Sequence, residues 1–135
     1  MTRQISVAAA FLVLALSGCG GGNEGAMATE PAHKIVDTSI GKVLATNRGM
    51  TLYTFAKDTT PGASSCNDRC AANWPPLIAL DDAQPVGKWT VLSRGDGMKQ
   101  WAYDGKPLYG WHEDKKEGDT GGDGQLDGAW KAARP

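Results

Sequence analysis

Two copies of one aromatic motif constrain the fold of this chain more than any other feature. Tyr53 to Asp58 (YTFAKD) aligns with Tyr109 to Asp114 (YGWHED), an offset of 56 residues (109 − 53). The same offset aligns landmarks outside the motif: Gly49 with Gly105, Leu52 with Leu108, Gly62 with Gly118, and Trp74 with Trp130. Such matches without a gap indicate one structural unit built twice. Cys66 and Cys70 fall opposite Gly122 and Leu126, so the copies share a scaffold and differ in their loops.

The segments around these landmarks have the composition of β-strands. We expect strands at Lys42 to Thr46, Thr51 to Phe55, Trp89 to Ser93, Lys99 to Tyr103 and Lys106 to Trp111. Asp104-Gly105 between the last two is a strong hairpin signal, and a two-residue turn there would place Leu108 opposite Trp101. Only residues 66–73 could form a short helix or turn, which Trp74-Pro75-Pro76 would end. The sequence predicts an all-β, small antiparallel domain over residues 34–135, made of two hairpin units (about 41–77 and 98–135).

The N-terminus has the pattern of an export signal. Arg3 precedes an apolar run from Ala8 to Leu16, which is shorter than the roughly 20 residues that span a bilayer. Leu16-Ser17-Gly18-Cys19 resembles the bacterial lipobox, in which the cysteine thiol receives diacylglycerol. We expect residues 1–18 to be a lipoprotein signal peptide and Cys19 to be the lipidated residue. The alternative is an ordinary secretory signal followed by a chance cysteine.

The residues after Cys19 predict how the domain is attached. Residues 19–33 begin with several glycines and stay small and polar, which is typical of a flexible tether. Of the fourteen basic residues, thirteen remain without Arg3, against fifteen acidic ones. This balance argues against nucleic acid as a partner, because nucleic-acid binding needs a basic stripe. We expect a lipid-anchored protein of the cell envelope that faces the periplasm or the cell exterior.

Once Cys19 is assigned to lipid, two cysteines remain. Cys66 and Cys70 would lie in an oxidising compartment, where disulfides persist, and a turned or helical backbone brings this spacing within disulfide range. We therefore predict that they pair. A metal or redox pair is the competing interpretation, although no second cysteine pair or nearby histidine accompanies them.

The repeated motif itself has two interpretations. Tyr53 and Phe55 share one face of a strand, as do Tyr109 and Trp111, because alternate residues point the same way. These rings either pack a core, with the tyrosine hydroxyls bonded to a polar partner, or form a platform for a sugar, a lipid headgroup or a flat cofactor. Asp58 and Asp114 follow the strands, where an aspartate often fixes its own loop and less often binds a ligand.

One polar loop suggests a metal site. Asp114, Asp119, Asp123 and Asp127 lie among glycines, and their oxygens could bind Ca²⁺, which takes about six to eight oxygen ligands. The spacing differs from an EF-hand and includes Lys115 and Lys116, so a solvated surface loop is the other interpretation. Haem or copper ligation by His112 with Met50 or Met98 is a further alternative. No cofactor is otherwise indicated.

Taken together, the landmarks resemble the predicted bacterial lipoproteins with a repeated Tyr-x-aromatic-x-x-Asp motif, also described as a secreted repeat of unknown function. The resemblance spans residues 41–135. It rests on Val43-Leu44, Gly49 to Tyr53, Asp58, Cys66 and Cys70 before Asn73 to Leu77, Gln100-Trp101, Pro107 to Tyr109, Trp111, Asp114 and Trp130. The resemblance implies an exported, usually lipid-anchored small domain with no established activity.

The function expected from the sequence is correspondingly general. The chain contains no G-x-S-x-G, no His-Glu-x-x-His and no phosphate-binding glycine loop. We therefore expect a non-enzymatic binding or interaction module whose protein or small-molecule partner is open. The alternative is a metal- or cofactor-binding envelope protein that uses the acidic loop or His112.

Overall fold

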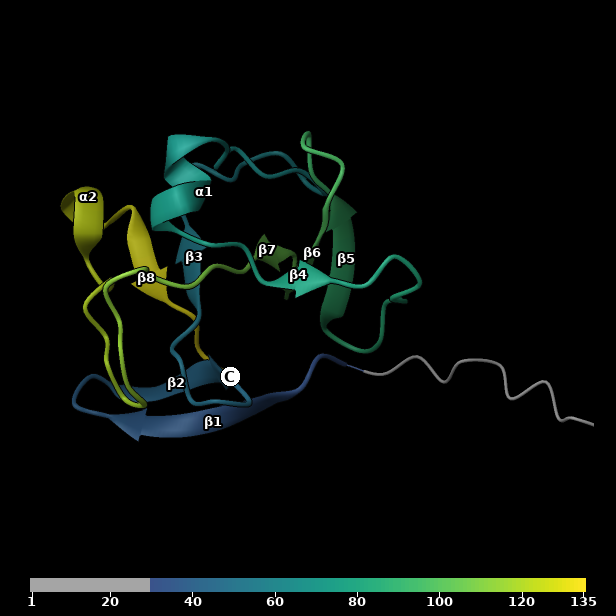
Figure 1. Ribbon diagram of the computed structural model, residues 1–135. Coiled ribbons are helices and arrows are strands. Elements are labelled where there is room, and N and C mark those ends of the chain that lie inside the picture. The colour runs from purple at the N-terminus through teal and green to yellow at the C-terminus, as the bar shows by residue number, and fades with distance from the viewer. Residues whose placement is uncertain (1–29) are drawn as a thin grey trace, which may run out of the picture.

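The computed structural model describes residues 30–135, and Figure 1 shows that part as a set of short strands with two short helices at the periphery. The predicted signal peptide, the predicted lipidation site at Cys19 and most of the predicted tether lie outside the described residues. His33, at the end of the predicted tether, is the first residue of a strand. No helix within residues 30–135 is long and apolar enough to cross a membrane.

The strands form three small antiparallel sheets. The first pairs β1 (His33–Thr38) with β2 (Gly41–Thr46), and the second pairs β3 (Tyr53–Phe55) with β8 (Trp130–Ala132). The third has the order β4-β6-β5, with β4 at Ile78–Ala79, β5 at Trp89–Ser93 and β6 at Lys99–Tyr103, and β7 (Lys106–Pro107) also pairs with β6. The helices are α1 (Arg69–Asn73) and α2 (Gln125–Gly128). The all-β antiparallel prediction is therefore confirmed.

The two copies exchange strands across an approximate two-fold axis. Tyr53 and Tyr109, which are equivalent motif residues, form an antiparallel bridge with N–H···O distances of 2.8 and 3.0 Å. On either side of it, the amide of Ala133 donates to the Leu52 carbonyl, as the amide of the equivalent Leu77 donates to the Leu108 carbonyl. Strand β3 of the first copy consequently pairs with β8 at the end of the second copy (Figure 1). Neither copy is complete without the other.

A column of four aromatic rings runs through this axis. Trp74 and Trp130 are equivalent residues, and their rings stack at a centroid distance of 3.8 Å with planes 2° apart. Phe55 stacks on Trp130 at 4.1 Å, and the equivalent Trp111 lies 4.2 Å from Trp74. Trp74 and Trp130 are buried, while the two outer rings are partly exposed. This arrangement predicts that the inner pair stabilises the fold most, because each inner ring loses nearly all of its contact with water.

The predicted hairpin at Asp104-Gly105 is confirmed in detail. Tyr103 pairs with Lys106 across a two-residue turn, and both turn residues have positive φ (52° and 79°), as a type I′ turn requires. The amide of Leu108 donates to the Trp101 carbonyl, which is the expected register. The predicted strand beyond it ends early: β7 ends at Pro107, the chain leaves β6 after Leu108, and Tyr109 forms bridges to Tyr53 and Pro76.

The other predicted strands match the observed ones only in part. Trp89–Ser93 and Lys99–Tyr103 are strands with the predicted bounds, whereas β3 begins at Tyr53, with Thr51 in a single bridge to Ala45. The sequence predicted no strand at the positions of β1, β4 and β8. The last two are only two and three residues long, too short to give a periodic signal.

Candidate functional site

The repeated motif forms two reciprocal hydrogen bonds between the copies. The Tyr53 hydroxyl donates to Oδ2 of Asp114 at 2.5 Å, and the Tyr109 hydroxyl donates to Oδ2 of Asp58 at 2.6 Å. Each tyrosine therefore bonds the aspartate of the other copy's motif. Both tyrosine side chains are fully buried, so their rings pack the core and are not an open platform.

Further hydrogen bonds hold the two aspartates in the same way. Asp58 accepts the amide of Ser65 at 2.7 Å, and Asp114 accepts the amide of the equivalent Gly121 at 3.0 Å. The Ser65 hydroxyl donates a second bond to Asp58 at 2.8 Å. The aspartates thus have the loop-fixing role, and they also join the two copies.

Tyr53 and Tyr109 should make the fold sensitive to alkaline pH. Burial and the hydrogen bond to Asp114 raise the pKa of Tyr53 far above its ordinary value, and burial and Asp58 raise the pKa of Tyr109 likewise. In the unfolded chain these phenols ionise near about pH 10. A raised folded pKa means that the stabilisation is complete below about pH 10 and is lost as pH rises toward the folded value.

The urea concentration at the midpoint of unfolding should fall as the pH rises from about 9 to 11. In the double variant Tyr53→Phe/Tyr109→Phe, the midpoint should change less with pH. The double variant is the control for lysines that titrate in the same range. Equal slopes in wild type and variant would show that the two phenols are not held neutral.

The predicted disulfide is present. Cys66 and Cys70 are bonded, with Cα atoms 5.2 Å apart, at the start of α1. Cys66 is fully buried in the core cluster that contains Trp74 and Trp130. Gly122, which is equivalent to Cys66, has no room for a side chain, because a Cβ there would approach Trp74 and Tyr53 to 2.8 Å. The loops of the two copies therefore pack differently against the same rings.

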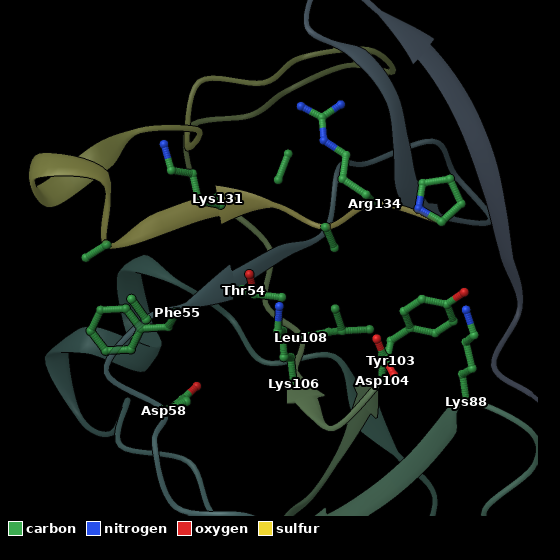
Figure 2. Close-up of a pocket in the computed structure, with 15 residues that line it drawn as sticks. Thr54, Phe55, Asp58, Lys88, Tyr103, Asp104, Lys106, Leu108, Lys131 and Arg134 are labelled. Atoms are coloured by element: carbon green, nitrogen blue, oxygen red, sulfur yellow. The ribbon is translucent and has the colours of Figure 1, made fainter.

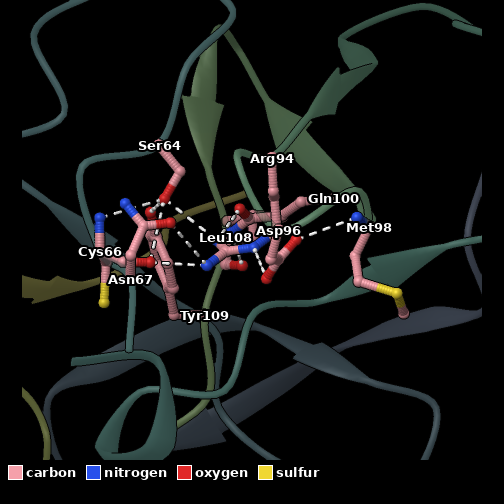
Figure 3. Close-up of polar contacts among 9 residues, drawn as sticks. All are labelled: Ser64, Cys66, Asn67, Arg94, Asp96, Met98, Gln100, Leu108 and Tyr109. Atoms are coloured by element: carbon pink, nitrogen blue, oxygen red, sulfur yellow. Dashed lines mark hydrogen bonds and ion pairs between the residues drawn. The ribbon is translucent and has the colours of Figure 1, made fainter. Parts of the chain in front are cut away.

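Sequence analysis missed one buried cation, Arg94. Figure 3 shows its guanidinium among polar groups: Nη2 donates to the Cys66 carbonyl at 2.6 Å, and Nη1 donates to Oε1 of Gln100 at 2.8 Å and to Ser64 Oγ at 3.1 Å. Its Nε donates to Asp96 at 3.1 Å. These bonds hold the disulfide loop against β6. The sequence offers no signal for this, because Arg94 begins a turn-like segment, Arg94 to Gly97, that reads as exposed.

Three of the four aspartates of the predicted calcium loop have separate hydrogen-bond partners, and the fourth is exposed. Asp114 bonds Tyr53 and Gly121, while Asp119 accepts the amides of Lys115 and Lys116, which hold the pKa of Asp119 below its usual range. Asp123 accepts the amide of Ala132 in β8, and Asp127 is exposed. Within residues 30–135 no group of three or more acidic, histidine or cysteine side chains could hold a metal ion.

His112, the candidate haem or copper ligand, lies at the surface. Its Nδ1 is 3.2 Å from the Asn73 carbonyl, and its ring packs edge-on against Trp111. Met98 lies in the turn between β5 and β6, and Met50 precedes β3. The structure thus places the three candidate ligands on three different segments.

An open pocket of about 570 Å³ lies between β8 and the β6–β7 hairpin. Figure 2 shows Lys131 and Arg134 on the β8 side and Lys106 on the hairpin side, with Phe55 and Tyr103 at opposite ends. Lys88 approaches the Tyr103 ring, with Nζ 5.7 Å from the ring centroid. Sequence analysis named only Phe55 and Asp58 among the lining residues as candidate site residues. The basic residues were missed because they come from three separate segments.

Comparison with known proteins agrees with the internal repeat. A lipoprotein family model described as a secreted repeat of unknown function matches residues 34–78 and again residues 90–134. The two matches are offset by the same 56 residues (90 − 34) that separate the aromatic motifs. No curated protein and no solved structure matches the chain.

Proposed function

Because the chain belongs to the lipoprotein family described as a secreted repeat of unknown function, we propose that it is a lipid-anchored envelope module that binds a ligand without catalysis. Membership in a secreted family fits an extracellular or envelope location. The lipobox-like Leu16 to Cys19 segment supports attachment through Cys19. Two or more acyl chains on that cysteine would hold the protein stably, since a single chain gives only marginal binding.

The pocket between β8 and the β6–β7 hairpin is the observation that carries the binding role. Its volume of about 570 Å³ lies in the range of about 300–1,000 Å³ that small-molecule sites occupy. The tyrosines and aspartates of the motif, by contrast, bond one another and build the scaffold. The pocket lies beside that scaffold, so the scaffold can hold its walls in place while they contact a ligand.

Replacing Cys19 with serine should release the protein from membranes or block its processing, because no thiol would remain to accept lipid. Membrane and soluble fractions of cells that express the full chain measure the effect. Cys66→Ser/Cys70→Ser is the matched control, since it removes the other two cysteines and should leave the protein membrane-bound. Unchanged membrane association of Cys19→Ser would contradict the anchor.

Photo-crosslinking in the native envelope tests the pocket. A photoreactive residue at Ala56 should form a covalent adduct with the ligand, because Ala56 is exposed and lines the cavity. A photoreactive residue at Ile78 is the control, since Ile78 is exposed on the equivalent part of the first copy. The adduct mass identifies the ligand. A chain whose mass is the same after irradiation at both positions would refute the binding role.

A further inference from the structure

Four basic side chains line the pocket without a carboxylate partner. They are Lys88, Lys106, Lys131 and Arg134. Within residues 30–135, none of the four forms an ion pair with an acidic side chain. Arg134 is held in place by bonds from Nη1 to the Ile40 and Lys42 carbonyls, both at 2.9 Å. Such a set of cations attracts an anion into a partly enclosed site.

The first copy provides an internal comparison for this charge. At the 56-residue offset, Lys106 corresponds to Met50, Lys131 to Pro75 and Arg134 to Ile78. None of these equivalents is charged, although the hydrogen bonds around Leu52 and Leu108 show that the backbones correspond. The scaffold therefore does not require basic residues at these positions. Their presence in the second copy alone indicates a role specific to this pocket.

The balance of charge indicates the class of anion. The only acidic side chains that line the pocket within the described residues are Asp58 and Asp104, so the basic side chains in the lining outnumber the acidic ones. Asp58 is already bonded to Tyr109 and Ser65. A phosphomonoester, with a charge of about −1.5 to −2 at pH 7 and three strong acceptor oxygens, can contact several of these cations at once, which a single carboxylate with two oxygens does less well. Phe55 and Tyr103 offer apolar surface for the organic part of such a ligand.

We propose that this pocket binds the phosphate group of an organic phosphate, with Lys106 and Lys131 as the principal contacts. The proposal rests on the proposed function and names the ligand class of the same site. A soluble phosphate ester and the headgroup of an anionic phospholipid share this chemistry. Lysine ammonium groups bind phosphate as point charges, so binding weakens as the salt concentration rises.

The test compares the thermal unfolding of the full lipidated chain with that of Lys106→Gln/Lys131→Gln. In detergent, inorganic phosphate and glycerol 3-phosphate are the soluble probes, and succinate at the same ionic strength is the carboxylate probe. In vesicles, phosphatidylcholine alone is compared with phosphatidylcholine that contains phosphatidylglycerol. Lys57→Gln/Lys116→Gln is the matched control, because it removes the same charge from two exposed lysines outside the pocket.

Phosphate probes at ten times the dissociation constant should raise the wild-type melting temperature by roughly 5 °C. The pocket variant should bind at least about tenfold more weakly, and the control variant should behave as wild type. A higher melting temperature with the soluble phosphate probes identifies a soluble phosphate ester as the ligand. A higher melting temperature only in vesicles with phosphatidylglycerol identifies a phospholipid headgroup. Equal stabilisation by succinate, equal loss in both variants, or no shift with any phosphate probe would overturn the proposal. If the photo-crosslinked adduct at Ala56 forms but carries no phosphorus, the phosphate assignment fails while the binding role stands.

Discussion

Trp130→Ala is expected to lower the free energy of unfolding by roughly 3–5 kcal/mol, the range for removing a fully buried tryptophan. Trp130 is 0% exposed and lies between Phe55 and Trp74 in the aromatic column. Its loss leaves a cavity at the axis where the two copies meet. Within the described residues the indole Nε1 has no hydrogen-bond partner, so the effect reports packing alone.

Urea unfolding followed by circular dichroism measures this loss. Phe55→Ala is the control, since it removes a ring from the partly exposed end of the same column and should cost less than half as much. A Trp130→Ala variant that unfolds within about 1 kcal/mol of wild type would show that the column does not hold the copies together.

Asp114→Ala is expected to cost about 3 kcal/mol, because it leaves two donors without an acceptor. The buried Tyr53 hydroxyl and the Gly121 amide both donate to this carboxylate. An unsatisfied buried donor costs roughly 1–3 kcal/mol. The neighbouring Glu113→Ala removes the same charge from an exposed side chain and should change stability by less than about 0.5 kcal/mol. Similar losses in the two variants would assign the effect of Asp114 to net charge.

The sequence predicted the units of this fold better than their connection. The Asp104-Gly105 turn has strong local chemistry, so it set the register of its hairpin, and the 56-residue offset gave the duplication. The spacing of the motif does not say which tyrosine bonds which aspartate. The exchange of strands between the copies depends on contacts such as that of Tyr53 with Tyr109, which join residues far apart in the chain and form only when the whole domain folds.

The residues of the proposed binding site were harder to predict than the scaffold. Three of the site's basic residues have the sequence context of ordinary surface lysines: Lys88, Lys106 and Lys131. Only the pairing of β3 with β8 brings Lys131 to the cavity that Lys88 and Lys106 also line. Arg94 was missed for a similar reason: its acceptor on Cys66 is 28 residues away in the chain. The acidic loop, by contrast, had a conspicuous composition, yet three of its four predicted ligands, Asp114, Asp119 and Asp123, bond separate backbone amides.

A double-mutant cycle tests the exchange between the copies most directly. Tyr53→Phe and Asp114→Asn should be coupled by at least about 1 kcal/mol, because the two side chains share one buried hydrogen bond. Tyr53→Phe and Asp58→Asn, which lie in the same motif, should be additive within about 0.5 kcal/mol. Coupled effects of the Tyr53 and Asp58 substitutions, together with additive effects of the Tyr53 and Asp114 substitutions, would contradict the reciprocal bonding. They would show that the tyrosine and the aspartate of the same motif bond each other.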